Sequence, residues 1–152
     1  LEVGHNPEMI LAGRRLNDNM GSYVVDQVLN LMNQKQIRIT GANILIMGFT
    51  FKENCPDLRN TQIIDLIKGF RKNDCNVDVY DPWVNKDDAK DEYGITTVNS
   101  PVQGKYDAIV LAVAHDEFLE LTIEQIKAFG QDKCVLYDIK YLLDADQVDG
   151  RL

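Results

Sequence analysis

In the first part of the chain, apolar residues recur at the spacing of an α-helix. They form one stripe between residues 9 and 31, made by Met9, Leu16, Met20, Val24, Val28 and Leu31. Asn6 and Pro7 suit the start of this helix, because Asn is a favoured N-cap and Pro a favoured first helical residue. A helix from there to Lys35 would rise about 42 Å. That length favours a helix that bridges domains or packs in a dimer interface; the alternative is an ordinary helix broken near Gly21.

From residue 41 the pattern changes to short apolar runs that alternate with amphipathic segments. The apolar runs predict strands at residues 43–48, 77–80, 95–98, 108–113 and 135–138. Helices are predicted at 61–73, with Asn60 as its cap, and at 122–129, where Thr122 and Gln125 have the spacing of a capping box. The alternation predicts an α/β fold, in which a parallel sheet is covered by helices on both faces.

Right-handed crossovers favour a doubly wound, Rossmann-like order for such a sheet. With the strands numbered along the sequence, we expect about five strands in an order such as 3-2-1-4-5, preceded by the long helix. Ligands of these sheets bind beyond the carboxyl ends of the strands. The segments that follow the strands at 43–48 and 108–113 are therefore the first candidates for a site.

Composition and charge narrow the possible functions. The 152 residues carry a net charge of -8, which opposes nucleic-acid binding, because phosphates require a basic face. No apolar run approaches the roughly 20 residues of a membrane span, and residues 1–7 do not resemble a signal peptide. The 3 scattered cysteines indicate neither a disulfide framework nor a metal site, and favour a reducing cytoplasm. Acidic clusters at 87–92 and 144–149 are expected to be solvated loops.

The loop after the first predicted strand lacks the usual dinucleotide motif. A G-x-G-x-x-G sequence would be expected there for NAD binding, and only Gly48 is present. Asp81 follows the second strand, as a ribose-binding acid would, but lies 33 residues after Gly48 instead of about 20. Independent NAD binding in the usual mode is therefore not expected.

The same loop carries cations and aromatic rings that suit an anionic ligand. Lys52 is a point charge for a phosphate or carboxylate, and Arg59 precedes a predicted helix whose N-terminus adds positive potential. Asp57 is close enough in sequence to orient Arg59. Phe49 and Phe51 would flank a sugar or a base. The alternative is a surface loop whose cations are solvated and whose Phe residues fill the core.

At this loop the sequence resembles the UDP-glucose/GDP-mannose dehydrogenase family. The matching motifs are Gly48-Phe-Thr-Phe51-Lys52, Asp57-Leu-Arg59 and Tyr80-Asp81-Pro82. Residues 6–21 also resemble the central helical region of the family, so the resemblance covers nearly the whole chain. Residues 51–60, together with Gly13-Arg-Arg and Asn17-Asp-Asn-Met, are most similar to the branch that oxidises UDP-N-acetylhexosamines. A UDP-glucose 6-dehydrogenase and a free-standing nucleotide-binding or regulatory module are the alternatives.

The resemblance implies a longer enzyme of three parts. An N-terminal Rossmann domain would hold NAD, and residues 1–38 would complete a central helical region that forms a homodimer. Residues 39–152 would bind the UDP-sugar. The enzyme would oxidise the C6 alcohol of the sugar to a carboxylate for polysaccharide synthesis, using a cysteine that lies upstream. No cysteine of this chain matches the family's nucleophile motif, so the chain alone is expected to be inactive.

The resemblance also assigns individual residues. Substrate contacts fall to Phe51, Lys52, Lys140 and either Arg14 or Arg15, the last two reaching the site of a partner subunit. Lys140 stands near a position where some members have a substrate-binding Arg. Arg59 would reach NAD bound by the other domain. His115, after the strand at 108–113, is expected to cap a helix or to support the site from behind, and Cys55 to be structural.

Overall fold

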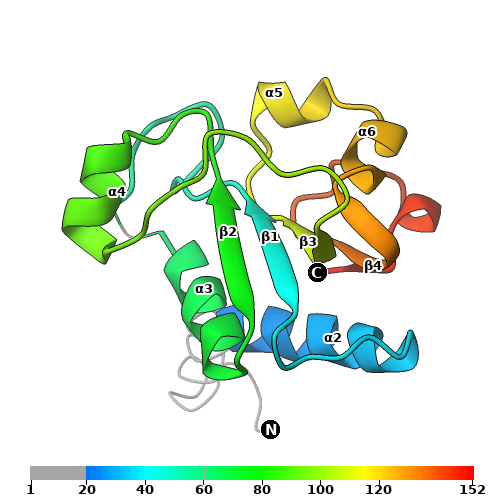
Figure 1. Cartoon of the computed structure of the whole chain (residues 1–152). Helices are drawn as coiled ribbons and strands as arrows, with labels where there is room; N and C mark the ends of the chain where they lie inside the picture. Colours follow the sequence, from blue (N-terminus) through cyan, green and yellow to red (C-terminus); the bar gives the residue numbers. More distant parts are fainter. Residues whose placement is uncertain (1–19, 60) are drawn as a thin grey trace, which may run out of the picture.

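Five parallel strands form the centre of the molecule (Figure 1), in the order β2-β1-β3-β4-β5. The computed structural model describes residues 20–59 and 61–152. The strands are β1 (Asn43–Met47), β2 (Asn76–Tyr80), β3 (Tyr106–Leu111), β4 (Gly130–Asp138) and β5 (Gly150–Arg151). β1 and β3 lie in the middle of the sheet, where Ile44 pairs with Val77 on one side and with Ala108 on the other. The α/β, Rossmann-like fold predicted from the sequence is confirmed.

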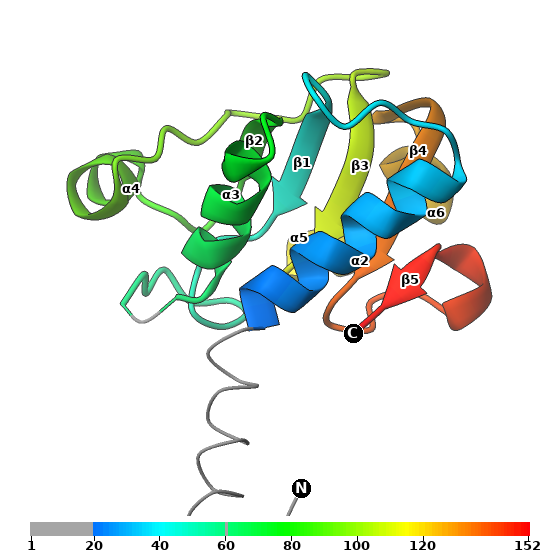
Figure 2. The same ribbon diagram turned by 90° about the horizontal axis from the view of Figure 1, so that it is seen from below.

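Helices cover both faces of this sheet (Figure 2). One face carries α2 (Met20–Gln34) and α3 (Ile63–Lys72), and the opposite face carries α5 (Asp116–Leu119) and α6 (Ile123–Lys127). α4 (Lys86–Tyr93) lies beyond the β2 edge (Figure 1). A short 3-10 helix, η1 (Ala145–Gln147), precedes β5. None of the described helices is both long and apolar enough to cross a membrane.

Alternating side chains of β1 divide the interior into two apolar cores. Ile44 and Ile46 pack with the buried residues of α2 and α3. Leu45 and Met47 point the other way and pack with Phe118, Ile126 and Leu136. Because neighbouring side chains of a strand face opposite sides, a continuous apolar run such as that of β1 serves both cores.

Glycines allow α2 and α3 to cross closely. A Cβ on Gly21 would lie 2.6 Å from the Cβ of Asp65, and one on Gly69 would lie 2.8 Å from Val25 Cγ2. Gly21 thus lies within α2, at a point of close helix contact. The helix start predicted at Asn6 and Pro7 lies outside the described residues, as does Asn60; the described part of α3 begins at Ile63.

The predicted strand at 95–98 is wrong. Val98 N–H donates to Val79 O at 2.9 Å, but residues 95–98 do not pair with β2 as a strand. The remaining predicted strands occur, in the predicted relative order. The two-residue β5, which pairs with Tyr137 and Asp138, was not predicted, because two residues carry no readable pattern.

The acidic clusters are not simply solvated loops. Residues 87–92 lie in α4, where Asn85 caps the helix by accepting the N–H of Asp88 and acidic residues in the first turn match the helix dipole. In the second cluster Asp149 accepts the N–H of Leu136 at 2.7 Å and pairs with Lys35 at 2.8 Å. Both clusters therefore have local structural roles.

Candidate functional site

A cavity of about 290 Å³ lies where three strands end. Its walls come from the segments after β1, β3 and β4 and from the start of α3: Thr50, Phe51, Ala112, Val113, Ile139, Lys140, Thr61, Gln62 and Ile63, with Met20 of α2. β2 lies on one side of β1 and β3 on the other, so the connections after β1 and β3 leave in opposite directions. This switch point is where doubly wound sheets bind ligands.

The start of α3 contributes polar groups and a favourable potential to the cavity. Thr61 Oγ1 donates to Phe49 O at 2.8 Å and accepts the N–H of Ile63 at 3.2 Å, which joins α3 to the loop after β1. Gln62 occupies the N-cap position without a side-chain cap bond. Because a helix N-terminus carries partial positive charge, it favours an anion in this cavity.

The buried carboxylate of Asp81 fixes the loop after β1. Its Oδ2 accepts the N–H groups of Phe49 at 2.6 Å and Thr50 at 3.1 Å, and its Oδ1 accepts that of Trp83 at 2.8 Å. Asp81 is only 6% exposed. Although Asp81 follows β2, as a ribose-binding acid would, its oxygens are bound by backbone N–H groups of the protein and by the His115 ring.

His115 lies behind the same loop and is fully buried. Its Nε2 is 2.9 Å from Asp81 Oδ2 and 3.2 Å from Thr50 Oγ1. The ring stacks on Trp83, with ring centroids 6.1 Å apart, and Trp83 Nε1 donates to Glu117. His115 occupies the N-cap position of α5 but makes no cap bond with its side chain. Of its two predicted roles, capping a helix and supporting the site from behind, the ring has the second.

Gly48 serves a packing contact. Its φ is +106°, and a Cβ would lie 2.6 Å from the Cβ of Val113. The glycine thus permits close approach of the segment after β3, where a dinucleotide-binding loop would use glycines to approach a pyrophosphate. In this loop the glycine therefore serves the packing of β1 against the segment after β3.

Two of the residues predicted to contact substrate come together in the cavity. Phe51, which is 55% exposed, lines the cavity from the loop after β1, and Lys140 lines it from the loop after β4. Asp138, fully buried at the end of β4, holds the second loop by accepting the N–H groups of Lys140 at 3.2 Å and Leu143 at 2.9 Å. Lys52 is exposed on the loop beside Phe51 but is not among the lining residues. Arg14 and Arg15 lie outside the described residues.

Arg59 lies outside the cavity and is paired with Asp57. Its Nε and a terminal nitrogen each lie 3.0 Å from an oxygen of that carboxylate, in a bidentate arrangement. The hydrogen bonds from Arg59 hold the pKa of Asp57 below its usual value, and the carboxylate raises the pKa of Arg59. The Arg59 side chain is 82% exposed, so the guanidinium is oriented by Asp57 while remaining open to solvent.

The three thiols are all free. Burial raises the pKa of Cys75, and raises that of Cys134 to about 12. Both are poor nucleophiles in the folded chain, since the thiolate is the reactive form. Cys55 is partly exposed but does not line the cavity.

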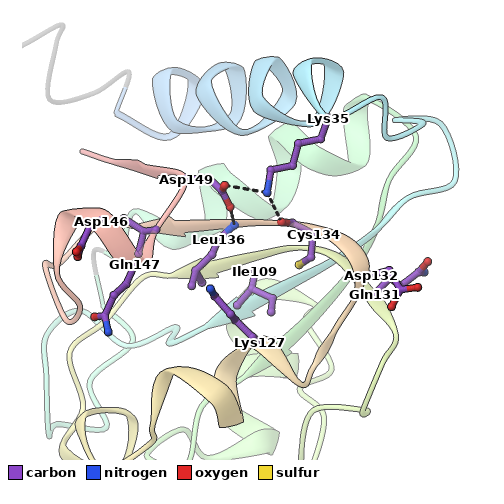
Figure 3. A pocket seen from close by; sticks show the side chains of 11 residues that line it. Lys35, Ile109, Lys127, Gln131, Asp132, Cys134, Leu136, Asp146, Gln147 and Asp149 are labelled. Carbon is purple, nitrogen blue, oxygen red and sulfur yellow. Dashed lines mark hydrogen bonds and ion pairs between the residues drawn. The ribbon is translucent and has the colours of Figure 1, made fainter.

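A second cavity, of about 360 Å³, lies near the opposite end of β4 (Figure 3). Lys35 spans part of it, with Nζ 2.8 Å from Asp149 Oδ1 and 2.9 Å from Cys134 O. Its charged lining residues are Lys35, Lys127, Asp132, Asp146 and Asp149. Acids outnumber bases there, and one base is already paired, so this cavity suits a diphosphate less well than the one at the strand ends.

Sequence reasoning missed three polar lining residues, Thr50, Thr61 and Gln62. Thr61 had a detectable signal, because a hydroxyl residue just before an amphipathic run is typical of a helix start. That this helix start meets the loops after β3 and β4 depends on the tertiary fold.

Comparison with known proteins identifies the family. The model of the UDP-glucose/GDP-mannose dehydrogenase family, UDP binding domain, matches residues 45–145. The chain belongs to this family. It is 54% identical to UDP-N-acetyl-D-glucosamine 6-dehydrogenase of Pseudomonas aeruginosa, covering 99% of this chain and 36% of that protein. The enzyme of the same name from Salmonella typhi is 53% identical, with 99% and 35% covered.

A solved structure shares the fold. The NDP-N-acetyl-D-galactosaminuronic acid dehydrogenase from Methanosarcina mazei Go1 superposes with a TM-score of 0.80 at 20% identity, over 97% of this chain and 30% of that one. The predicted family and its N-acetylhexosamine branch are thus confirmed. The chain spans about a third of the length of these relatives.

Proposed function

We propose that this chain is the UDP-sugar-binding part of an NAD-dependent UDP-N-acetylhexosamine 6-dehydrogenase. The observation that carries the proposal is the cavity at the ends of β1, β3 and β4, lined by Phe51 and Lys140 in a chain of this family. The whole enzyme would oxidise the C6 alcohol of the sugar to a uronate for surface polysaccharide, in the cytoplasm. Its substrate class follows from the N-acetylhexosamine enzymes that resemble the chain over 99% of its length.

The chemistry of the cavity suits a nucleotide diphosphate sugar. Lys140, with the N-terminus of α3, offers positive charge to the diphosphate, and Lys52 would add a second cation from the exposed loop that carries Phe51. Phe51 presents an exposed aromatic face for the base or the sugar. Arg14 or Arg15 would complete the site of a partner subunit.

Hydride acceptance would come from NAD bound by a part of the enzyme outside this chain. Within the chain, Arg59 is the residue that would contact this NAD, because its guanidinium, oriented by Asp57, is open to solvent. The chain provides substrate binding and orientation, and the nucleophilic cysteine lies elsewhere. Residues 1–38 would contribute to the homodimer.

The proposal is tested by ligand-observed NMR titration of this 152-residue chain. UDP-N-acetylglucosamine should bind in the roughly millimolar range, and Lys52→Ala or Lys140→Ala should weaken binding about tenfold. Lys133→Ala is the matched control, because Lys133 is an exposed lysine in the N-terminal half of β4 and does not line the cavity. Preference for UDP-glucose would favour a UDP-glucose 6-dehydrogenase. NAD binding without UDP-sugar binding would overturn the proposal in favour of a free-standing dinucleotide module.

A further inference from the structure

The loop that carries Phe51 and Lys52 is held from behind by a buried polar group. Asn54 N–H donates to His115 Nδ1 at 2.9 Å, and Thr50 Oγ1 lies 3.2 Å from His115 Nε2. Asp81 Oδ2 lies 2.9 Å from the same Nε2. Asn54, in turn, accepts the N–H of Asp116 with its side chain. The loop is therefore tied to the end of β2 and to the start of α5.

Donor and acceptor positions define the protonation form of His115. A backbone N–H can only donate, so Nδ1, which faces Asn54 N–H, must act as an acceptor and carry no proton. The proton of the neutral ring is then on Nε2, where Asp81 Oδ2 and Thr50 Oγ1 are both within reach. A doubly protonated ring would place Nδ1–H against Asn54 N–H.

The hydrogen bonds of Thr50 and Asn54 lie on either side of Lys52 in the sequence. On its N-terminal side, Thr50 Oγ1 donates to the carbonyl oxygen of Lys52 itself at 2.9 Å. On its C-terminal side, Asn54 is held by His115. Asn54 has a positive φ of 55°, a conformation that requires support from its surroundings. The backbone at Lys52 is thus fixed on both sides by groups that contact the one imidazole.

We propose that His115, in its Nε2–H form, is the positioning residue that presents Lys52 to the UDP-sugar; this rests on the function proposed above. His115 is fully buried, between Trp83 and Phe118, and both ring nitrogens are engaged by the protein. It therefore has no route to the substrate as an acid or base. It acts on ligand binding through the loop.

The test combines a double-mutant cycle with a local probe of the loop. His115→Phe keeps a flat ring between Trp83 and Phe118 but removes the polar contacts with Asn54, Thr50 and Asp81. We expect it to weaken UDP-N-acetylglucosamine binding about fivefold in the unmodified chain and less than about twofold in the Lys52→Ala background, because the two residues act through one contact. An equal loss of affinity in both backgrounds would mean a general structural effect. It would overturn this inference but leave the proposed function standing.

Backbone hydrogen exchange reports on the loop without ligand. Asn54 N–H should be protected in the unmodified chain, lose that protection in His115→Phe, and regain it in His115→Asn, whose side-chain oxygen can replace Nδ1. His115→Gln replaces Nε2–H and should not restore it. Unchanged exchange in His115→Phe would overturn the inference even if that variant bound ligand weakly, and the Asn and Gln variants give the same answer if the Phe variant fails to fold. A chain that does not bind the UDP-sugar at all would overturn the proposed function together with this inference.

Discussion

Phe51 and Lys140 line the same cavity although they follow different strands, β1 and β4. β3 lies between those strands in the sheet. The segment after β3 lines the cavity with the small residues Ala112 and Val113. Small side chains there leave space between the two loops. The cavity thus results from long residues at its sides and short ones in its middle.

Phe51→Ala should weaken UDP-sugar binding without loss of stability. An aromatic contact contributes about 1 kcal/mol, which corresponds to roughly fivefold in the dissociation constant. Because the side chain is 55% exposed, the free energy of unfolding should change by less than about 0.5 kcal/mol. Titration by NMR and urea denaturation measure the two quantities. Val102→Ala, at a valine that is 50% exposed, is the control and should change neither.

Gly48→Ala should destabilise the chain strongly. The substitution adds a methyl group 2.6 Å from Val113 Cβ at a φ of +106°, so steric clash and backbone strain together should cost about 3 kcal/mol. Gly104→Ala provides the comparison, because the φ of Gly104 is +69° but an added Cβ would have no atom within 4 Å apart from its chain neighbours. Backbone strain alone should therefore cost about 1 kcal/mol. Urea denaturation measures both. Equal costs would contradict the packing role of Gly48.

Arg59→Ala should change the titration of Asp57 and leave UDP-sugar affinity unaltered. The hydrogen bonds from Arg59 lower the pKa of Asp57, so their removal should move it up towards 3.8. With Arg59 present, the interaction stabilises the folded chain above that pH and is lost as the pH falls through the lowered value. Carboxyl carbon shifts measured by NMR against pH follow the change. A weakened UDP-sugar affinity would contradict the assignment of Arg59 to the cofactor side.

The thiols should differ in reactivity. At pH 8, iodoacetamide should modify Cys55 first, because Cys75 is buried and Cys134 has a pKa of about 12. Mass spectrometry identifies the labelled residue, and all three should react in urea. Above pH 9 the unfolded chain ionises Cys134 while the folded chain keeps it neutral, so stability should fall as the pH rises towards 12. Labelling of Cys134 as fast as that of Cys55 would contradict this account.

Local patterns were sufficient for most elements of the fold. The apolar runs identified β1, β3 and β4, because strands buried on both faces need apolar side chains in succession. The box formed by Thr122 and Gln125 is present as predicted, since its two hydrogen bonds involve residues only three positions apart. The acidic helix α4 was missed, because its polar sequence has almost no apolar stripe and its stability depends on Asn85 and Gly94 at its ends.

The family motif and the candidates Phe51, Lys52, Arg59 and Lys140 could be recognised without the structure. The sequence also indicated that the loop lacks a dinucleotide grip, because that motif is local. Which of these candidates share a cavity depends on the folded chain, since parallel strands bring together loops that are far apart in sequence. The tertiary structure also assigned Asp81 to the support of the loop after β1, and it showed that His115 supports this loop without capping α5 with its side chain. Their partners in that loop are 31 to 65 positions away, and a buried hydrogen bond over such a separation leaves no periodic signal in the chain.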